Sequence, residues 1–148
     1  MMTATATTLT RSAQRGLSQR KTVATRTGWG DLSLTKGRDG IFLMAQTPIL
    51  GRHRQPTQAI RFSTEQAAAL VDVLDICRTE PAGDHMIPRL VAGRSPGDDI
   101  ELCDNPFSHV VSLIQRNPGA GETEHPFDLL IIVRDAIDDL IEAINCLL

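Results

Sequence analysis

Basic side chains in the first half of the chain have the types and the spacing that could bind an anion. A protein that binds nucleic acid without sequence preference needs positive charges for the phosphates and flat side chains on which bases stack. Arg61 lies between two apolar residues of an expected strand, so alternation turns it away from the apolar face. The segment GRHR places two arginines on an exposed connection. The candidate nucleic-acid-binding residues are Lys21, Arg26, Trp29, Lys36, Arg38, Arg52, Arg54 and Arg61. The alternative interpretation is a solvated basic surface, with the tryptophan at its rim or in the core.

No other set of residues predicts a reaction. The segment GAGETEH has closely spaced glycines, but neither the lysine nor the helical pattern of a phosphate-binding loop follows them. The four histidines have no metal-ligand spacing to one another or to the three cysteines. We therefore predict no catalytic residue, no metal, no cofactor and no enzymatic activity.

The net charge of −3 hides two oppositely charged halves. Residues 1–78 contain 11 Lys or Arg and 5 acidic residues, a net +6, whereas residues 79–148 contain 4 and 13, a net −9. This asymmetry predicts an anionic partner for the first half and a different surface, such as a protein, for the second. The alternative is that the two halves attract each other or solvate different faces of one fold.

The composition of the N-terminus and the cysteines bear on the cellular compartment of the protein. The first 30 residues contain no Asp or Glu, which predicts a flexible basic arm over residues 1–19. We expect a cytoplasmic protein, although the same composition fits a mitochondrial or plastid transit peptide. The three cysteines predict reduced, mostly buried thiols. No apolar run approaches the roughly 20 residues of a membrane span, so we expect no membrane partner.

The closing strand and helix of the first half have a counterpart 70 residues later. AIRFSTEQAAALVDVLDIC, from residue 59, aligns with the end of FDLLIIVRDAIDDLIEAINCLL, from residue 127. Apolar positions spaced as i, i+3, i+4 and i+7 give each helix one stripe that faces a core. Ser63 and Gln66 predict a capping box for the first helix, and Asp135 is the expected cap of the second.

The correspondence extends upstream through three more expected strands. GIFLMAQ at 40–46 matches HVVSLIQ at 109–115, with Gln46 on Gln115. DLSLT matches DIELC 68 residues later, and KTVATR at 21–26 corresponds to PRLVAG. The segment TPILGRHRQPTQ is read as an irregular loop between the third and fourth strands, because Pro and Gly exclude regular structure.

The sequence therefore predicts an α+β fold of tandem β-β-β-β-α repeats, in which antiparallel curved sheets are each closed by a helix. The expected organisation is a basic arm, a basic first repeat, a linker and an acidic second repeat, over residues 1–19, 20–78, 79–86 and 87–148.

The strand LLIIV in the second repeat is apolar on both faces, unlike a half-exposed antiparallel strand. Something must cover its second face, which predicts a homo-oligomer or a protein partner. The alternative is cover by the chain's own arm or loops. The predicted interface residues are Leu129, Ile131 and Val133.

The order of these segments resembles a known family. GDLSLTKGRDGIFLMAQ, the basic loop GRHRQP and AIRFSTEQAAALVDVL are similar in order and spacing to the Whirly-type fold of the positive-cofactor transcriptional coactivators. The resemblance implies two β4α units whose sheets and basic loops hold single-stranded nucleic acid. The chain departs from the family in two respects: it offers only Trp29 and Phe42 for stacking near the first sheet, and its second repeat is acidic.

We thus predict a non-enzymatic protein that binds single-stranded DNA or RNA through its basic first repeat, with little sequence preference. The alternative is a protein–protein adaptor, an assembly factor or a small acidic chaperone-like protein. Such a protein would bind its partner through the apolar strand and the acidic half.

Overall fold

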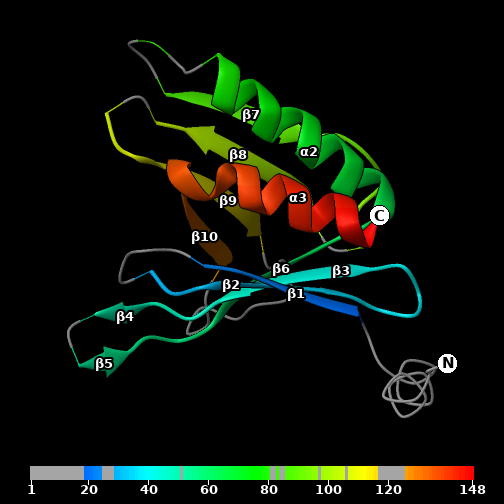
Figure 1. Cartoon of the computed structure of the whole chain (residues 1–148), viewed down its shortest axis with the longest axis horizontal. Coiled ribbons are helices and arrows are strands. Elements are labelled where there is room, and N and C mark those ends of the chain that lie inside the picture. The colour runs from blue at the N-terminus through cyan, green and yellow to red at the C-terminus, as the bar shows by residue number, and fades with distance from the viewer. Residues whose placement is uncertain are drawn as a thin grey trace, which may run out of the picture.

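In the part of the chain that the structure describes, two four-stranded antiparallel sheets pack with two α-helices (Figure 1). This computed structural model describes residues 19–24, 29–50, 52–80, 83, 86–96, 98–105, 107–116 and 126–148. In chain order, four strands of one sheet precede a helix, and four strands of the other sheet precede a second helix. The predicted α+β fold of tandem β4α repeats is confirmed. The predicted arm at 1–19 lies outside the described residues, except for its last residue.

The first sheet has the strand order β1-β2-β3-β6, and all neighbours are antiparallel. Its strands are β1 (Gln19–Val23), β2 (Leu32–Lys36), β3 (Phe42–Gln46) and β6 (Gln58–Phe62). The first strand therefore begins two residues earlier than the predicted segment 21–26. The predicted irregular loop between β3 and β6 is wrong as well, because it contains a short hairpin of β4 (Ile49–Leu50) and β5 (His53–Arg54). Pro48 and Pro56 lie outside this hairpin, so their lack of a backbone N–H removes no hydrogen bond from its ladder.

The second sheet repeats this order as β10-β9-β8-β7. Its strands are β7 (Ile87–Val91), β8 (Ile100–Asp104), β9 (Val110–Arg116) and β10 (Phe127–Val133). In both sheets the last strand before the helix pairs with the third strand of its repeat, and the first strand lies at the opposite edge. The two sheets therefore have the same topology.

The first helix begins as predicted and the second does not. Helix α2 (Thr64–Thr79) has a complete capping box, in which Ser63 and Gln66 each accept a backbone N–H of the other. Helix α3 (Ile137–Leu147) follows directly from a 3-10 turn, η1 (Arg134–Ala136). Asp135 is inside that turn and makes no side-chain cap, so the predicted cap is wrong. The turn itself occupies the place where a cap would stand.

Each helix packs on the repeat that it does not belong to. Helix α2 contacts β7, the edge strand of the second sheet, whereas α3 contacts β1 and β2 of the first sheet. The two helices also lie side by side against each other (Figure 1). Arg78 of α2 forms an ion pair across this contact with Asp138 of α3 at 2.6 Å, and another within its own helix with Asp75. The repeats are therefore interlocked, and they share one core.

The core consists mainly of aliphatic side chains on alternate positions of both sheets. Leu32, Leu34, Phe42 and Met44 are fully buried on the inner face of the first sheet, and Leu102, Leu113, Leu130 and Ile132 on that of the second. Two phenylalanines stack in the first repeat, with 5.2 Å between the ring centroids of Phe42 and Phe62. Complete burial of a side chain of this size contributes about 1.5–3 kcal/mol. The apolar faces of α2 and α3 complete the core.

Two buried glutamines join the sheets where their last strands meet. The side chain of Gln46 donates to the carbonyl of Ile131 at 2.7 Å and accepts the N–H of the same residue at 2.9 Å. Gln115 makes the same pair of hydrogen bonds to Arg61, at 2.7 Å and 2.8 Å. Each side-chain amide thus pairs with the backbone N–H and carbonyl of one residue on the edge strand of the opposite repeat. We call these two contacts the glutamine bridges.

The glutamine bridges are related by the predicted repeat register. Gln46 also donates to the carbonyl of Gly30 at 3.1 Å, and Gln115 donates to that of Asp98 at 2.9 Å. A third equivalent pair lies beside them: Leu129 donates to Gln58 at 3.1 Å, and Ala59 donates to Asp128 at 3.4 Å. Every member of one set is 68 to 70 residues from its counterpart in the other. The halves therefore pack about an approximate two-fold axis, like the subunits of a symmetric dimer.

Candidate nucleic-acid interface

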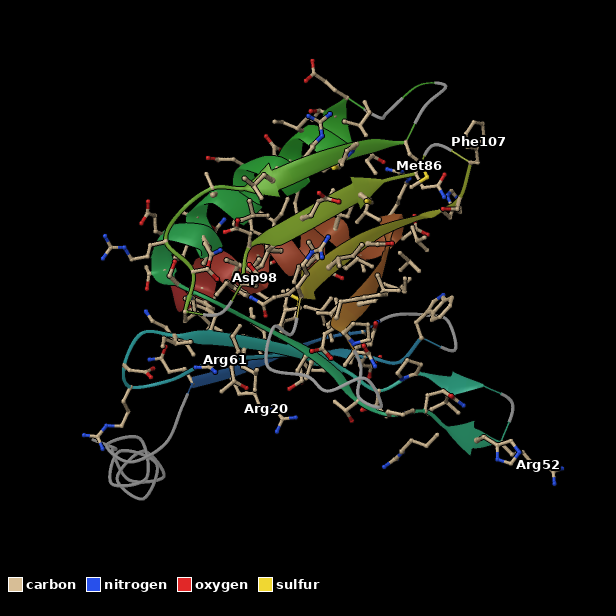
Figure 2. The ribbon with its side chains drawn as sticks, turned by 180° about the vertical axis from the view of Figure 1, so that it is seen from behind. Arg20, Arg52, Arg61, Met86, Asp98 and Phe107 are labelled. Carbon is tan, nitrogen blue, oxygen red and sulfur yellow. The ribbon has the colours of Figure 1, made fainter. Side chains whose placement is uncertain are left out.

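The outer face of the first sheet, on the side away from the helices, is basic at both edges. The strand registers align Arg20 with Thr35, Thr35 with Leu43, and Leu43 with Arg61, so the four form one row across the sheet. Both arginines are exposed, and both are drawn below the first sheet in Figure 2. Three strand spacings separate their backbones by roughly 14 Å. The row therefore presents two separated cations on a face that the core does not use.

Small and hydroxyl side chains fill the rest of this face. The neighbouring row contains Thr22, Ser33, Ala45 and Ala59. A groove of about 470 Å³ lies over it and extends to Arg20 at one edge. Gly30 at its margin has a positive φ of 87°, and a β carbon there would lie 2.2 Å from the Thr47 carbonyl oxygen. These residue types leave room for a ligand to approach the backbone closely.

The predicted basic connections are exposed. Arg38 lies in the turn between β2 and β3, and Arg52 and Arg54 lie on the β4–β5 hairpin. Figure 2 shows Arg52 at the outer end of this hairpin, beyond the body of the first sheet. Among the described residues, the ion pairs found involve only the arginines at 78 and 134. The hairpin arginines therefore keep their charge for a ligand.

Two predicted lysines lie elsewhere. Lys36 donates from Nζ to the carbonyl of Leu147 at 2.9 Å and lies 5.7 Å from the ring centroid of Phe42. It thereby neutralises the negative end of helix α3. Lys21 pairs with Leu34, on the side of the sheet that faces α3, and lines a hollow beside Glu142. Neither belongs to the row of Arg20 and Arg61. Arg26 lies outside the described residues.

Trp29 lies at the junction of the two sheets, and its side chain is 38% exposed. It lines a hollow of about 310 Å³ together with Pro48 and Gln55 from the first repeat and Phe127 from the second. Phe127 is 44% exposed. Two accessible aromatic rings therefore border one hollow between the hairpin and the second sheet. Trp29 is a rim residue and not part of the core.

The predicted interface strand is partly covered within the chain. Leu129 and Ile131 line the same hollow as Trp29, and Ile131 is only 9% exposed. Val133 packs against the core at the other end of the strand. Segments of the first repeat thus cover part of the outer face of β10. An interface role for these three residues stays a prediction.

A buried polar cluster at the far end of the second sheet has a structural role. Asp104 is fully buried and accepts from Arg134 at 2.5 Å, and Arg134 also donates to the carbonyl of Asn105 at 2.8 Å. Burial, with the nearby Asp104 carboxylate, raises the pKa of the Cys77 thiol to about 11. Burial and the carboxylate of Glu101 also raise the pKa of Cys103. Of the three cysteines, only Cys77 is buried, so the prediction of mostly buried thiols is wrong.

Sequence reasoning missed two residues of this surface. The predicted segment 21–26 begins two residues after the strand itself, and so it does not include Arg20. Alternation counted back from the inward Val23 puts Arg20 on the outer face and Lys21 on the inner one. Phe127 begins the apolar strand β10, and its exposure depends on the position of the hairpin and of Trp29. No pattern in the sequence indicates that position.

Comparisons of the chain with models of protein families, with curated proteins and with solved structures find no match. In the part of the chain that the structure describes, no three His, Cys, Asp or Glu side chains gather as a metal site would require. No helix in the same part has the length and apolar character needed to cross a membrane. The fold and the site together define a two-sheet α+β protein with one basic sheet face.

Proposed function

We propose that the protein binds single-stranded nucleic acid along the outer face of its first sheet. The observation that carries this proposal is the row from Arg20 to Arg61, with only small, hydroxyl or apolar side chains between the two cations. Positive charges that follow a strand backbone, without base-specific contacts, are what binding with little sequence preference requires. The exposed Arg38, Arg52 and Arg54 extend the positive surface at two sides of the sheet.

The hollow beside Trp29 supports a single strand in preference to a duplex. Unpaired bases can stack on exposed rings, whereas the bases of a duplex are already stacked. Trp29 and Phe127 border this hollow, and Gln55 is also part of its lining. Stacking of a base on such a ring contributes about 1–3 kcal/mol. The resemblance of the sequence to the Whirly-type single-stranded-DNA-binding fold is in line with this assignment.

The acidic residues of the helices do not oppose the proposal. Asp75 and Asp138 lie on the two helices, which cover the inner faces of the sheets. The ligand would approach from the opposite side of the first sheet. The anion and the acidic helices are therefore separated by the sheet and by the core.

The test is a titration of fluorescently labelled single-stranded oligonucleotide, followed by anisotropy, at several salt concentrations. Exchange of Arg20 and Arg61 for alanine should weaken binding at least tenfold. It should also lower the slope of log K against log[salt] by about 1.4, because each phosphate contact to a single strand contributes about 0.7. Trp29→Ala should weaken binding without changing that slope, since it removes stacking and no charge.

The matched control removes two positive charges from other surfaces. Lys21→Ala with Arg94→Ala changes the net charge equally, at an inner-face lysine and at an exposed arginine of the second repeat. Its affinity should stay within threefold of the wild type. If both double variants lose affinity equally, only net charge is involved and the outer face is not the site. Absence of binding at low salt would also refute the proposal.

A further inference from the structure

The outer face of the second sheet carries a groove at the place equivalent to that of the first sheet, with a volume of about 580 Å³. The register aligns Leu90 with Glu101, Glu101 with Ile114, and Ile114 with Leu129 in one row across four strands. Three positions of the two grooves show the equivalence: Leu90, Glu101 and Ile114 stand where the first repeat has residues 22, 33 and 45. The two repeats therefore have grooves at equivalent positions of their sheets.

The two grooves differ in chemistry. At the three equivalent positions the first has threonine, serine and alanine, whereas the second has two large apolar side chains and a carboxylate. Within the described part of the chain, the first groove contains one carboxylate, that of Asp31, and the second contains three. Leu90 is 62% exposed and Phe127 is 44% exposed, which is unusual for large apolar residues of a sheet face. Asp98, Asp99 and Glu101 supply three carboxylates, and Arg116 is the one cation among the described residues of the lining. This surface repels phosphate and suits a cationic segment that also carries an apolar side chain.

The β4–β5 hairpin of this chain has that composition. Arg52, His53 and Arg54 are all exposed on it, and Ile49 on its first strand is 45% exposed. The hairpin projects from the body of the first sheet (Figure 1), whereas Asp98, in the connection that leads into β8, lies well away from the hairpin tip (Figure 2). The hairpin tip and the Asp98 end of the groove therefore lie apart on one molecule, so the tip can reach that end of the groove only on another copy.

We propose that the β4–β5 hairpin of one copy docks into the second-sheet groove of another copy. The guanidinium groups of Arg52 and Arg54 pair with the carboxylates of Asp99 and Glu101, and Ile49 covers the exposed Leu90. The half that contains the hairpin has a net charge of +6 and the half that contains the groove has −9, so the overall charges also favour this contact. The inference does not rest on nucleic-acid binding, because the outer-face row of Arg20 and Arg61 takes no part in the contact, but the two proposed sites share Arg52, Arg54 and Phe127.

The contact joins two different surfaces, so it does not close on itself as a two-fold dimer does. Each bound copy still offers a free hairpin at one end and a free groove at the other, and assembly continues into a ring or an open chain. Because ion pairs at an exposed rim are screened by salt, association should weaken steeply as the ionic strength rises. An oligonucleotide that uses Arg52 and Arg54 would compete with the neighbouring copy.

The experiment is light scattering coupled to size exclusion, with two charge-reversed variants of the full chain. One reverses the hairpin (Arg52→Glu with Arg54→Glu), and the other reverses the groove (Asp99→Arg with Glu101→Arg). At about 50 mM salt the wild type should show a weight-average mass at least twice that of the 16.1 kDa chain, falling to the monomer at about 500 mM. Each variant alone should be a monomer, because like charges then face each other.

An equimolar mixture of the two variants should associate again, because it restores opposite charges across the contact. Circular dichroism spectra that match the wild type exclude misfolding as the cause of the monomeric state. A wild type that stays monomeric at low salt overturns the proposal, as does a mixture that stays monomeric. The Arg20→Ala with Arg61→Ala variant keeps the hairpin and the groove, so its mass at about 50 mM salt should match that of the wild type, which separates self-association from nucleic-acid binding.

Discussion

Replacing Gln46 with leucine measures what the glutamine bridges contribute to holding the two repeats together. The amide is 1% exposed and makes three hydrogen bonds: two to Ile131 and one to Gly30. Leucine has a similar size but neither donates nor accepts. The substitution therefore removes the bonds while it keeps most of the packing.

The expected cost follows from the groups that lose their partner. The N–H and the carbonyl of Ile131 would remain buried and unpaired, and each such group costs about 1–3 kcal/mol. Burial of the leucine side chain offsets about 1–2 kcal/mol of this. We expect a net loss of about 3 kcal/mol in the free energy of unfolding. For a chain of this size that corresponds to a fall in Tm of about 9 °C.

The assay is urea unfolding at pH 7, followed by far-ultraviolet circular dichroism, with the slope m compared between variants. Gln115→Leu should cost less than Gln46→Leu. Its amide makes the equivalent three bonds, but the backbone groups of Arg61 that it satisfies are only partly buried, so water can replace the lost partner. Gln58→Leu is the matched control. Its side chain accepts one bond, from Leu129 at 3.1 Å, so it should cost about 1 kcal/mol or less.

Two results would refute this reasoning. If Gln46→Leu and Gln58→Leu cost the same, the bridge to Ile131 adds nothing beyond an ordinary hydrogen bond. If Gln115→Leu costs as much as Gln46→Leu or more, the burial of the unpaired backbone groups does not set the cost.

Two further predictions concern the shared core and the buried thiol. Each helix packs on the sheet of the other repeat, so separate chains of residues 1–80 and 81–148 should each show the circular dichroism spectrum of an unfolded chain. Mixing the two chains should restore the native spectrum. A folded isolated half would contradict the interlocked core. A pKa of about 11 leaves about one Cys77 thiol in a thousand ionised at pH 8, so a thiol reagent should label the exposed Cys146 first and Cys77 only on unfolding. Since that pKa is raised above the ordinary thiol value of 9.0, the protonated thiol stabilises the fold below pH 9, and this contribution should be lost as the pH rises toward 11. Cys77→Ala should abolish the loss.

Much of the fold could be predicted because both periodicities of the sequence are undisturbed in the core. Alternating apolar residues placed Ile60 and Phe62 on one face, and both are fully buried. The repeat register put Gln46 on Gln115, and these two residues have the same role in the structure. The capping box of α2 was predicted correctly because it depends only on Ser63 and the residue three positions later.

The errors fall where a local pattern competed with neighbours distant in sequence. The predicted cap at Asp135 failed because the chain leaves β10 through a 3-10 turn. The hairpin was missed because strands of two residues are too short to show alternation. Lys36 is predicted to bind the ligand, but its Nζ donates to the carbonyl of Leu147. That residue is 111 positions away, so no local pattern reveals the contact.

The sequence by itself determined the repeated unit, its element order and the division into a basic and an acidic half, because these follow from local periodicity and composition. Only the tertiary structure decided which repeat each helix covers and which backbone groups the two glutamines satisfy. It also decided which basic side chains share a face, so that Arg20 joins Arg61 and Lys36 does not. Those outcomes depend on how two sheets of the same topology pack against each other. That packing is set by contacts between residues 54 to 111 positions apart, which no local pattern encodes.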